Sequence, residues 1–426
     1  MVADIRYMKK AFIISAIASN QGKTLLSMAL MHYYKKSVSP FKCGPDFIDP
    51  QFHEKIAQTP SVNLDLYMMN QQQVKWIYQH YFDKEIAIVE GVMGYYDGMD
   101  KGSSAYDIAK TLAIPSLLVL DAGGSYITVS AILKGMCEFR CDNTIKAVVL
   151  NNISSQIHYE LVKKYINKEL PFIKVCGWIQ KGLKSLSSTH LGLDLKELDF
   201  KRIENVTKEV LEHIDINSLE SISEVVLDSF LDYPFKNIVK KDGLCVVVKD
   251  KNFSFLYHDN LQYLKELYKE VIVIDSTKDE VVPQNADIVI IPGGYVETDE
   301  SYNRIKDSKN FLNSLRLHAQ DKKIYAECAG LIYLGESCDE KEMSGILPIK
   351  FEMSDKRERL GYYKYDKKDG TTLKGHSFHY SKIVSAPSTD IKLYKVSKKT
   401  AKDGGYRQGK IFATYLHTMW RVGGII

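Results

Sequence analysis

Short apolar runs rich in β-branched residues alternate with longer amphipathic stretches along the first half of this sequence. The runs are residues 11–17, 85–90, 116–121 and 146–151. Between them, residues 24–36 and 125–138 repeat their apolar side chains at helical intervals. Because strands that are apolar on both faces must be covered by helices on both sides, the pattern predicts a parallel sheet in a three-layer, doubly wound α/β fold.

A second α/β series follows a segment of different composition. Residues 195–241 are charged and helix-favouring, contain no strong strand, and end in the basic turn Lys240, Lys241, Asp242 and Gly243. Strand-like runs then resume at residues 244–248, 271–274, 288–291 and 323–326. Since 426 residues are too many for one ordinary core, we expect a first domain over 1–195, a helical linker over 196–241 and a second domain over 242–426.

Charge and composition exclude several classes of protein. The 57 basic and 53 acidic residues leave a net charge of only +4, spread along the chain, so nucleic acid is not expected as a partner. No stretch approaches the roughly 20 apolar residues that cross a bilayer. Residues 1–10 contain charged side chains, which favours a first strand over a signal peptide. Seven single cysteines without a C-x-x-C pair fit a reducing, cytoplasmic compartment.

The first strand leads into a loop that can bind phosphate. Residues 18–24 connect the strand 11–17 to the helix-forming residues 25–34, and the loop residues expected to bind a nucleotide are Asn20, Gln21, Gly22, Lys23 and Thr24. Loop N–H groups would bind phosphate oxygens, Lys23 would reach the β and γ phosphates, and Thr24 would ligate magnesium. Ile17 stands where the strict motif has its first glycine, so an ordinary Gly-Lys turn remains an alternative.

Carboxylates gather after the predicted strand ends. Glu90 ends the run 85–90, Asp46 and Asp49 lie in a turn with Gly44 and Pro45, and Asp97 precedes a glycine. Ligands bind at the carboxyl ends of strands in such sheets, so these residues are expected to bind magnesium or position a reacting group. The alternative for any single Asp is a turn cap.

A possible cysteine nucleophile lies in the second half. Cys328 stands between the strand 323–326 and a helix over 331–336, as in a nucleophile elbow, and the N–H of Ala329 would face an oxyanion. Gly293 and Gly294, after the strand 288–291, can supply a second N–H, each such donor being worth roughly 2.7–4 kcal/mol. His417 follows an apolar run and would be the base. No acid stands two residues after His417, so a third triad member is absent or comes from elsewhere.

Both halves together resemble the cobyrinic acid a,c-diamide synthase family, over nearly the whole chain. The motifs that carry the resemblance are residues 40–50 (PFKCGPDFIDP), 63–65 (NLD), 90–98 (EGVMGYYDG), 190–193 (HLGL) and 375–381 (GHSFHYS). The resemblance implies a P-loop ATP-binding domain of the dethiobiotin-synthetase type followed by a class I-like glutamine amidotransferase domain. Departures from the family pattern are Ala16 and Asn20 in place of glycine, Ser377 in place of Glu, and Ala329 in place of glycine.

The resemblance also implies an activity. ATP would phosphorylate the a and c acetate carboxylates of cobyrinate, and ammonia released from glutamine at Cys328 would displace the phosphate. Lys23 and Thr24 would serve ATP and Mg²⁺, and Asp46, Glu90 and Asp97 would surround the metal and the acyl phosphate. Expected partners are therefore the small molecules cobyrinate (or a related tetrapyrrole), glutamine and ATP, and a homodimer is one assembly open to the chain.

Two other functions stay open. The tetrapyrrole could instead be hydrogenobyrinate or nickel sirohydrochlorin, which carry the same two acetates. In a more remote alternative, the first domain is a nucleotide switch of the partitioning-ATPase kind and the second domain is not catalytic. Glutamate release that depends on Cys328 would distinguish an enzyme from a switch.

Overall fold

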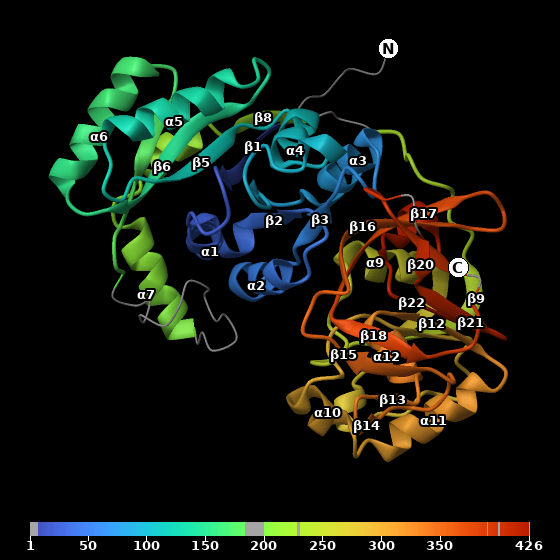
Figure 1. Cartoon of the computed structure of the whole chain (residues 1–426). Helices are drawn as coiled ribbons and strands as arrows, with labels where there is room; N and C mark the ends of the chain where they lie inside the picture. Colours follow the sequence, from blue (N-terminus) through green and yellow to red (C-terminus); the bar gives the residue numbers. More distant parts are fainter. Residues whose placement is uncertain (1–6, 184–199, 228–230, 390, 399–400, 426) are drawn as a thin grey trace, which may run out of the picture. The chain divides into compact units, whose positions relative to one another are not determined.

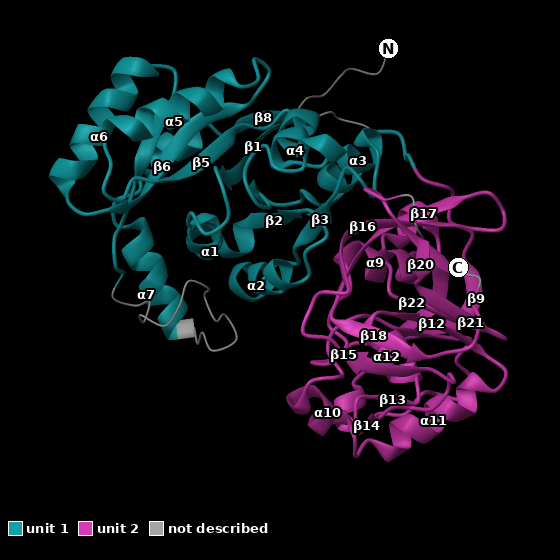
Figure 2. Cartoon of the chain, viewed as in Figure 1, with its two compact units in different colours: residues 1–234 teal, residues 235–426 magenta. Residues whose placement is uncertain are grey.

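The chain forms two compact units, residues 1–234 and 235–426 (Figure 2). The computed structural model describes residues 7–183, 200–227, 231–389, 391–398 and 401–425. The motif at residues 190–193 therefore lies outside the described residues.

The first unit is built on a mostly parallel sheet (Figure 1). Its strands are β1 (Tyr7–Ala16), β2 (Val38–Cys43), β3 (Val62–Leu64), β4 (Ile86–Glu90), β5 (Ser116–Asp121), β6 (Ile145–Ile153), β7 (Lys174–Gln180) and β8 (Glu224–Leu227). The order is β3-β2-β4-β1-β5-β6-β7, with β1 in the middle. Every pairing along this path is parallel, whereas β8 pairs antiparallel with β1. The expectation of a parallel α/β sheet is confirmed.

Helices cover this sheet because alternate strand residues face opposite sides. The helices are α1 (Lys23–Tyr34), α2 (Ile48–Ala57), α3 (Gln71–Tyr81), α4 (Ala105–Leu112), α5 (Ile127–Glu138), α6 (Gln156–Glu169), α7 (Phe200–Leu211) and α8 (Ile216–Ser221), with short 3₁₀ turns η1 (Lys35–Ser37) and η2 (Met99–Lys101). One core joins residues of α1, α2 and α7 to the strand residues Phe12, Ile14 and Val119. The order of elements matches the alternation expected of a doubly wound fold.

The segment 196–241 differs from its expectation. Within it, α7 contributes Ile203, Val206 and Val210 to the core under α1, and residues of β8 extend the first unit's sheet. The sequence led us to expect no strong strand here, and β8 is a weak one: it has four residues, of which only Val225 is buried. Its sequence therefore carries little of the apolar pattern that marks a buried strand.

The second unit is also an α/β structure. Its main sheet has the order β10-β9-β11-β12-β22-β21, parallel except at β21–β22. These strands are β9 (Lys241–Val248), β10 (Tyr268–Ile274), β11 (Ile288–Ile291), β12 (Lys323–Glu327), β21 (Gly405–Gln408) and β22 (Ile411–Thr414). Its helices are α9 (His258–Leu267), α10 (Asp299–Ile305), α11 (Lys309–Ala319), α12 (Ala329–Leu334) and α13 (Trp420–Gly423), with the turn η4 (Ser276–Lys278).

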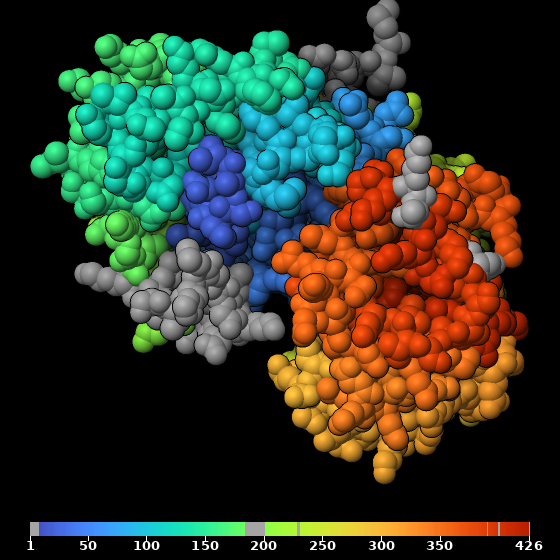
Figure 3. Space-filling view, in the orientation of Figure 1, coloured from blue at the N-terminus to red at the C-terminus, as the bar shows by residue number. Residues whose placement is uncertain are grey.

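Two small sheets complete the second unit. One contains β13 (Ser337–Cys338), β14 (Lys341–Glu342), β15 (Lys350–Met353) and β18 (Ser381–Ser385); the other contains β16 (Arg359–Asp366), β17 (Thr372–His379), β19 (Lys392–Lys395), β20 (Ala401–Asp403) and β23 (His417–Thr418). Their orange and red segments form much of the face of this unit seen in Figure 3. The chain passes from β22 in the main sheet to β23, where His417 pairs with His376 of β17. His417 therefore lies where two sheets meet.

Candidate functional site

The loop after β1 has the backbone that a phosphate-binding loop requires. Strand β1 ends at Ala16 and helix α1 begins at Lys23. Asn20 and Gly22 have φ angles of 61° and 98°, in the left-handed region that glycine and asparagine tolerate best. A Cβ atom on Gly22 would lie 2.6 Å from Nδ2 of Asn151, which itself donates to the carbonyl oxygen of Gln21 at 3.0 Å. The loop is thus held by a side chain of β6, which lies two strands away from β1 in the sheet.

Lys23 bends back over this loop. Its Nζ donates to the carbonyl oxygen of Ala18 at 2.7 Å. Burial and the nearby charge of Lys42 lower the pKa of Lys23 to about 8, against the opposing effect of Glu90 and Asp97. An ammonium held in a partly buried position over this loop suits an anionic ligand, whose charge would compensate for the lost hydration.

Glu90 lies at the centre of a buried polar cluster. Its Oε1 accepts hydrogen bonds from Thr24 Oγ1 at 2.8 Å and from Lys42 Nζ at 3.0 Å, and its Oε2 lies 2.9 Å from His53 Nε2. Burial alone would raise the pKa of Glu90, yet the charge of Lys42 and the hydrogen bond with His53 hold it well below its ordinary value. Glu90 and Thr24, expected at one metal site, are therefore in direct contact.

Lys42 and His53 were not expected at this site. Lys42 stands inside β2, which contains a proline, and its Nζ also contacts Asp49 Oδ2 at 2.5 Å. Burial opposes the charge of Lys42, but Glu90 and Asp49 raise its pKa above the ordinary value. Lys42 lies within the motif 40–50, which drew attention through its aspartates, and His53 lies four residues after Asp49.

The aspartates join the same cluster in different ways. Asp46 lies 3.9 Å from Lys42 Nζ, and its Oδ1 accepts from the N–H of Ile48 at 2.8 Å, so it also caps the start of α2. Burial and the charge of Glu90 raise the pKa of Asp49 to about 6. Asp97 Oδ2 accepts from the N–H of Gly94 at 2.8 Å. The turn-capping alternative thus holds for Asp46 and Asp97 alongside their place near the loop.

The cluster provides oxygen donors for a hard cation. Across the described parts of the chain, no three or more His, Cys, Asp or Glu side chains are grouped as a metal site. Magnesium, however, is commonly bound through one or two protein oxygens, with water and substrate phosphates completing its shell. The hydroxyl of Thr24 and the carboxylates of Glu90 and Asp46 fit that donor chemistry.

A strained elbow presents Cys328 in the second unit. Cys328 has φ 48° and ψ −104°, an unfavourable backbone for a residue with a Cβ atom, and it separates β12 from α12. A Cβ on Gly330 would lie 2.4 Å from the carbonyl oxygen of Ile291, so only glycine allows the helix to pass this close to β11. This is the strand, sharp turn and helix that a nucleophile elbow requires.

His417 lies against the elbow. It is 2% exposed. Burial alone would lower the pKa of His417, but hydrogen bonds with Cys328 and Glu327 raise it to about 9. A Cβ on Gly293 would lie 2.3 Å from the imidazole Cε1, which places the end of β11 directly beside the ring. The structure therefore brings together Cys328, His417 and Gly293, with Ala329 next to the cysteine.

Glu327 is a member of this site that the sequence did not reveal. Its Oε2 lies 3.3 Å from His417 Nδ1. The carboxylate in contact with His417 thus belongs to the residue immediately before Cys328, and not to one that follows the histidine. The signal was present as an acidic residue at the elbow, but sequence spacing alone does not show that its side chain turns toward His417.

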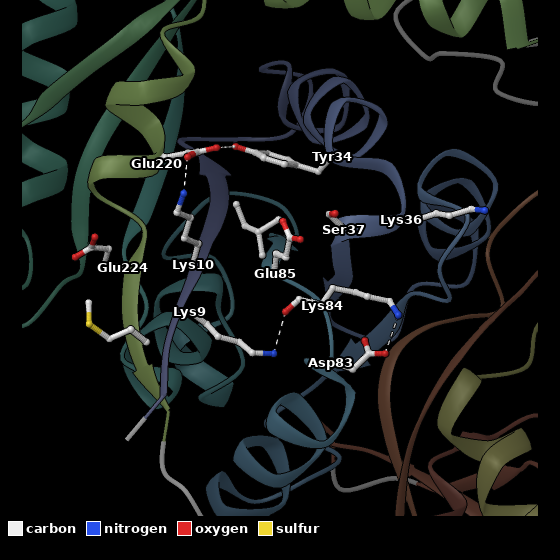
Figure 4. A pocket seen from close by; sticks show the side chains of 12 residues that line it. Lys9, Lys10, Tyr34, Lys36, Ser37, Asp83, Lys84, Glu85, Glu220 and Glu224 are labelled. Atoms are coloured by element: carbon white, nitrogen blue, oxygen red, sulfur yellow. Dashed lines mark hydrogen bonds and ion pairs between the residues drawn. The ribbon is translucent and has the colours of Figure 1, made fainter. Parts of the chain in front are cut away.

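A pocket of about 700 Å³ lies at the amino ends of β1 and β4, at the edge of the first sheet opposite the phosphate-binding loop, and is less suited to catalysis than that loop (Figure 4). Lys10 Nζ contacts Glu220 at 2.5 Å, and the Tyr34 hydroxyl donates to the same carboxylate at 2.9 Å. Lys84 pairs with Asp83 at 2.9 Å. These charges neutralise one another at the amino ends of β1 and β4, whereas ligands of α/β sheets bind at the carboxyl ends.

None of the helices in the described residues combines the length and the apolar character needed to span a bilayer.

Comparison with known proteins follows the same division of the chain. Residues 245–423 match the model of the CobB/CobQ-like glutamine amidotransferase domain. The cobyrinate a,c-diamide synthase of Fusobacterium nucleatum subsp. nucleatum is 34% identical over 441 residues, covering 96% of this chain and 97% of that protein. The synthase of the same name from Streptococcus sanguinis is 32% identical over 436 residues, covering 96% and 95%.

Solved structures align much less well. Chloroplast FtsY from Physcomitrella patens, at 17% identity and a TM-score of 0.29, covers 46% of this chain and 65% of its own, a likeness too distant to support an inference. The sequence matches to the synthases, by contrast, extend over both units. The chain belongs to the cobyrinate a,c-diamide synthase family.

Proposed function

We propose that this protein is an ATP-dependent amide synthase that converts the a and c acetate carboxylates of cobyrinate into carboxamides, using ammonia from glutamine. Membership of the synthase family and the amidotransferase domain support the reaction class. The observation that carries the proposal is the contact of His417 with both the Cys328 thiol and the Glu327 carboxylate at a strained elbow. Such a group is built for attack on an acyl carbon.

Glutamine hydrolysis would proceed at Cys328. The thiolate attacks the carboxamide carbon, and the oxyanion that forms is stabilised by backbone N–H groups of Ala329 and of Gly293 or Gly294. Protonated His417 gives its proton to the leaving ammonia, which leaves a thioester on Cys328. His417 then removes a proton from water, and hydrolysis of the thioester releases glutamate and restores the thiolate.

Carboxylate activation would proceed at the loop of the first unit. Asn20, Gln21, Gly22 and Lys23 would bind the ATP phosphates. Thr24, Glu90 and Asp46 would hold Mg²⁺, which would supply positive charge against that of the phosphates. Transfer of the γ phosphate to the substrate carboxylate gives an acyl phosphate and ADP, with Asp97 beside Lys23 helping to position the reacting groups. Ammonia attacks the acyl carbon, phosphate leaves, and a carboxamide remains. All seven cysteines are free thiols, which suits the cytoplasm as the compartment we propose.

The division of labour between the two centres is tested by Cys328→Ala. Glutamine-dependent amidation should disappear, while synthesis from added ammonium chloride with ATP should continue at a rate near that of the wild type. Cys141→Ala is the matched control, because Cys141 is an exposed free thiol of the other unit and its loss should change neither assay. Loss of ammonia-dependent synthesis in a folded Cys328→Ala protein would contradict the proposal.

The identity of the macrocycle needs a direct comparison. Purified protein would be incubated with ATP, glutamine and cobyrinate, hydrogenobyrinate or nickel sirohydrochlorin, and the amides counted by mass spectrometry. We expect two amides on cobyrinate and the highest kcat/KM for it. Amidation of none of the three macrocycles, with ATP turnover that needs no carboxylate, would favour the nucleotide switch instead. Light scattering on the same preparations would test for a homodimer.

A further inference from the structure

A buried carboxylate lies beside the histidine of the glutaminase site. Glu327 is the last residue of β12 and is 2% exposed. Its Oε2 faces His417 Nδ1 at 3.3 Å. No acid follows His417 closely, since Thr418 and Met419 come next. An imidazole that must carry a proton in a buried site needs a negative partner, and Glu327 is the carboxylate that contacts it.

The other oxygen of Glu327 is held by donors from two segments. Oε1 accepts from the hydroxyl of Tyr325 at 2.8 Å, from Trp420 Nε1 at 3.1 Å, and from Thr418 Oγ1 at 3.3 Å, with the N–H of Thr418 at 3.4 Å. All these partners donate, and an ionised carboxylate can only accept. Burial, together with the charge of Glu327, raises the pKa of Tyr325 well above its ordinary value, so this phenol stays protonated and donating. The donor set therefore suits a charged carboxylate with one oxygen left for His417.

The arrangement follows from the geometry of β12. Side chains two apart in a strand share a face, which puts the Tyr325 hydroxyl beside the Glu327 carboxylate. The next residue, Cys328, takes a positive φ, so the chain turns sharply where the strand ends. Because of that turn, consecutive residues can reach the same imidazole, one with a carboxylate and the other with a thiol. Thr418, which follows His417, contributes hydroxyl and amide donors to the carboxylate.

We propose that Glu327 is the positioning carboxylate of the glutaminase site, accepting the Nδ1 proton of His417 and so completing a triad from the residue immediately before the nucleophile. The inference rests on the proposed glutaminase role of Cys328. Accepting from Nδ1 leaves Nε2 as the nitrogen that exchanges a proton with the thiol and with the leaving ammonia. Glu327 touches neither substrate nor product, and it acts through His417 alone.

Glu327→Gln tests the charge with little change of shape. Glutaminase kcat, measured as glutamate release without any macrocycle, should fall by roughly 10²-fold or more, because the imidazolium loses its partner. KM for glutamine should stay near the wild-type value, and ammonia-dependent synthesis should be unchanged. Glu327→Asp, which keeps the charge one methylene further away, should fall between the two. Tyr325→Phe removes one donor but keeps the carboxylate, and should retain more activity than Glu327→Gln.

A second readout separates positioning from mere support of the fold. Thiolate absorbance at 240 nm, taken as the difference from Cys328→Ala, should appear at higher pH in Glu327→Gln than in the wild type, with Glu327→Asp between them. An unchanged thiolate titration and kcat in Glu327→Gln would overturn the inference. If that variant does not fold, the titration of Glu327→Asp decides in the same way. Failure to amidate cobyrinate would refute the substrate proposal but would leave both readouts intact.

Discussion

Gly293→Ala offers a sharp test of how closely β11 approaches the catalytic histidine. A Cβ atom at this position would lie 2.3 Å from His417 Cε1, whereas real Cβ contacts are rarely closer than 3.4 Å. The imidazole or the strand must therefore move by about 1 Å. The backbone N–H survives the substitution, so a loss of activity would report the position of His417 rather than a missing oxyanion donor.

The expected effect is a fall of about 10²-fold in glutaminase kcat, because misplacing a catalytic group by about 1 Å costs that much. Glutamate release and ammonia-dependent synthesis would be measured side by side, and only the first should fall. Gly135→Ala is the control: Gly135 lies in α5 with nothing within 4 Å of an added Cβ, so alanine should be neutral or slightly stabilising. Gly293→Ala with glutaminase activity within about twofold of the wild type would refute the reasoning, since a 1 Å displacement could not be so harmless.

Two further predictions concern buried charges. Lys42→Met should lower the free energy of unfolding of the first unit by about 3–5 kcal/mol in denaturant titrations, because Asp49 and Glu90 would lose their buried cation. The control Lys84→Met breaks an exposed ion pair with Asp83 and should cost less than about 1 kcal/mol. Equal costs for the two variants would contradict the prediction. The pKa of His417 is raised to about 9 in the folded protein, so protonation of His417 stabilises the second unit. This stabilisation is fully present below the ordinary pKa of 6.5 and is lost as the pH rises through 9. Denaturant midpoints between pH 6 and pH 10 should therefore fall less steeply in Cys328→Ala than in the wild type, and parallel curves would contradict the prediction.

Long apolar strands and the helices between them were predictable because burial on both faces leaves a strong pattern. The run 116–121 coincides with β5, and 288–291 with β11. Elements that depend on tertiary partners were not predicted. Strand β2 contains Pro40 and the buried Lys42, and β8 has four residues of which one is buried. Each is a strand because it pairs with a neighbour, β2 with β4 and β8 with the first residues of β1.

The sequence by itself determined the two α/β series, the loop with Lys23 and Thr24, and the elbow with Cys328, because each depends on residues adjacent in the chain. Only the tertiary structure decided which distant groups meet them. Lys42 and His53 reach Glu90 across neighbouring elements. Glu327 reaches His417 because β12 pairs with β22, which sets Glu327 beside Thr414, three residues before His417. The spacing of residues along a chain predicts local backbone geometry, whereas packing in the folded protein decides which distant group a side chain contacts.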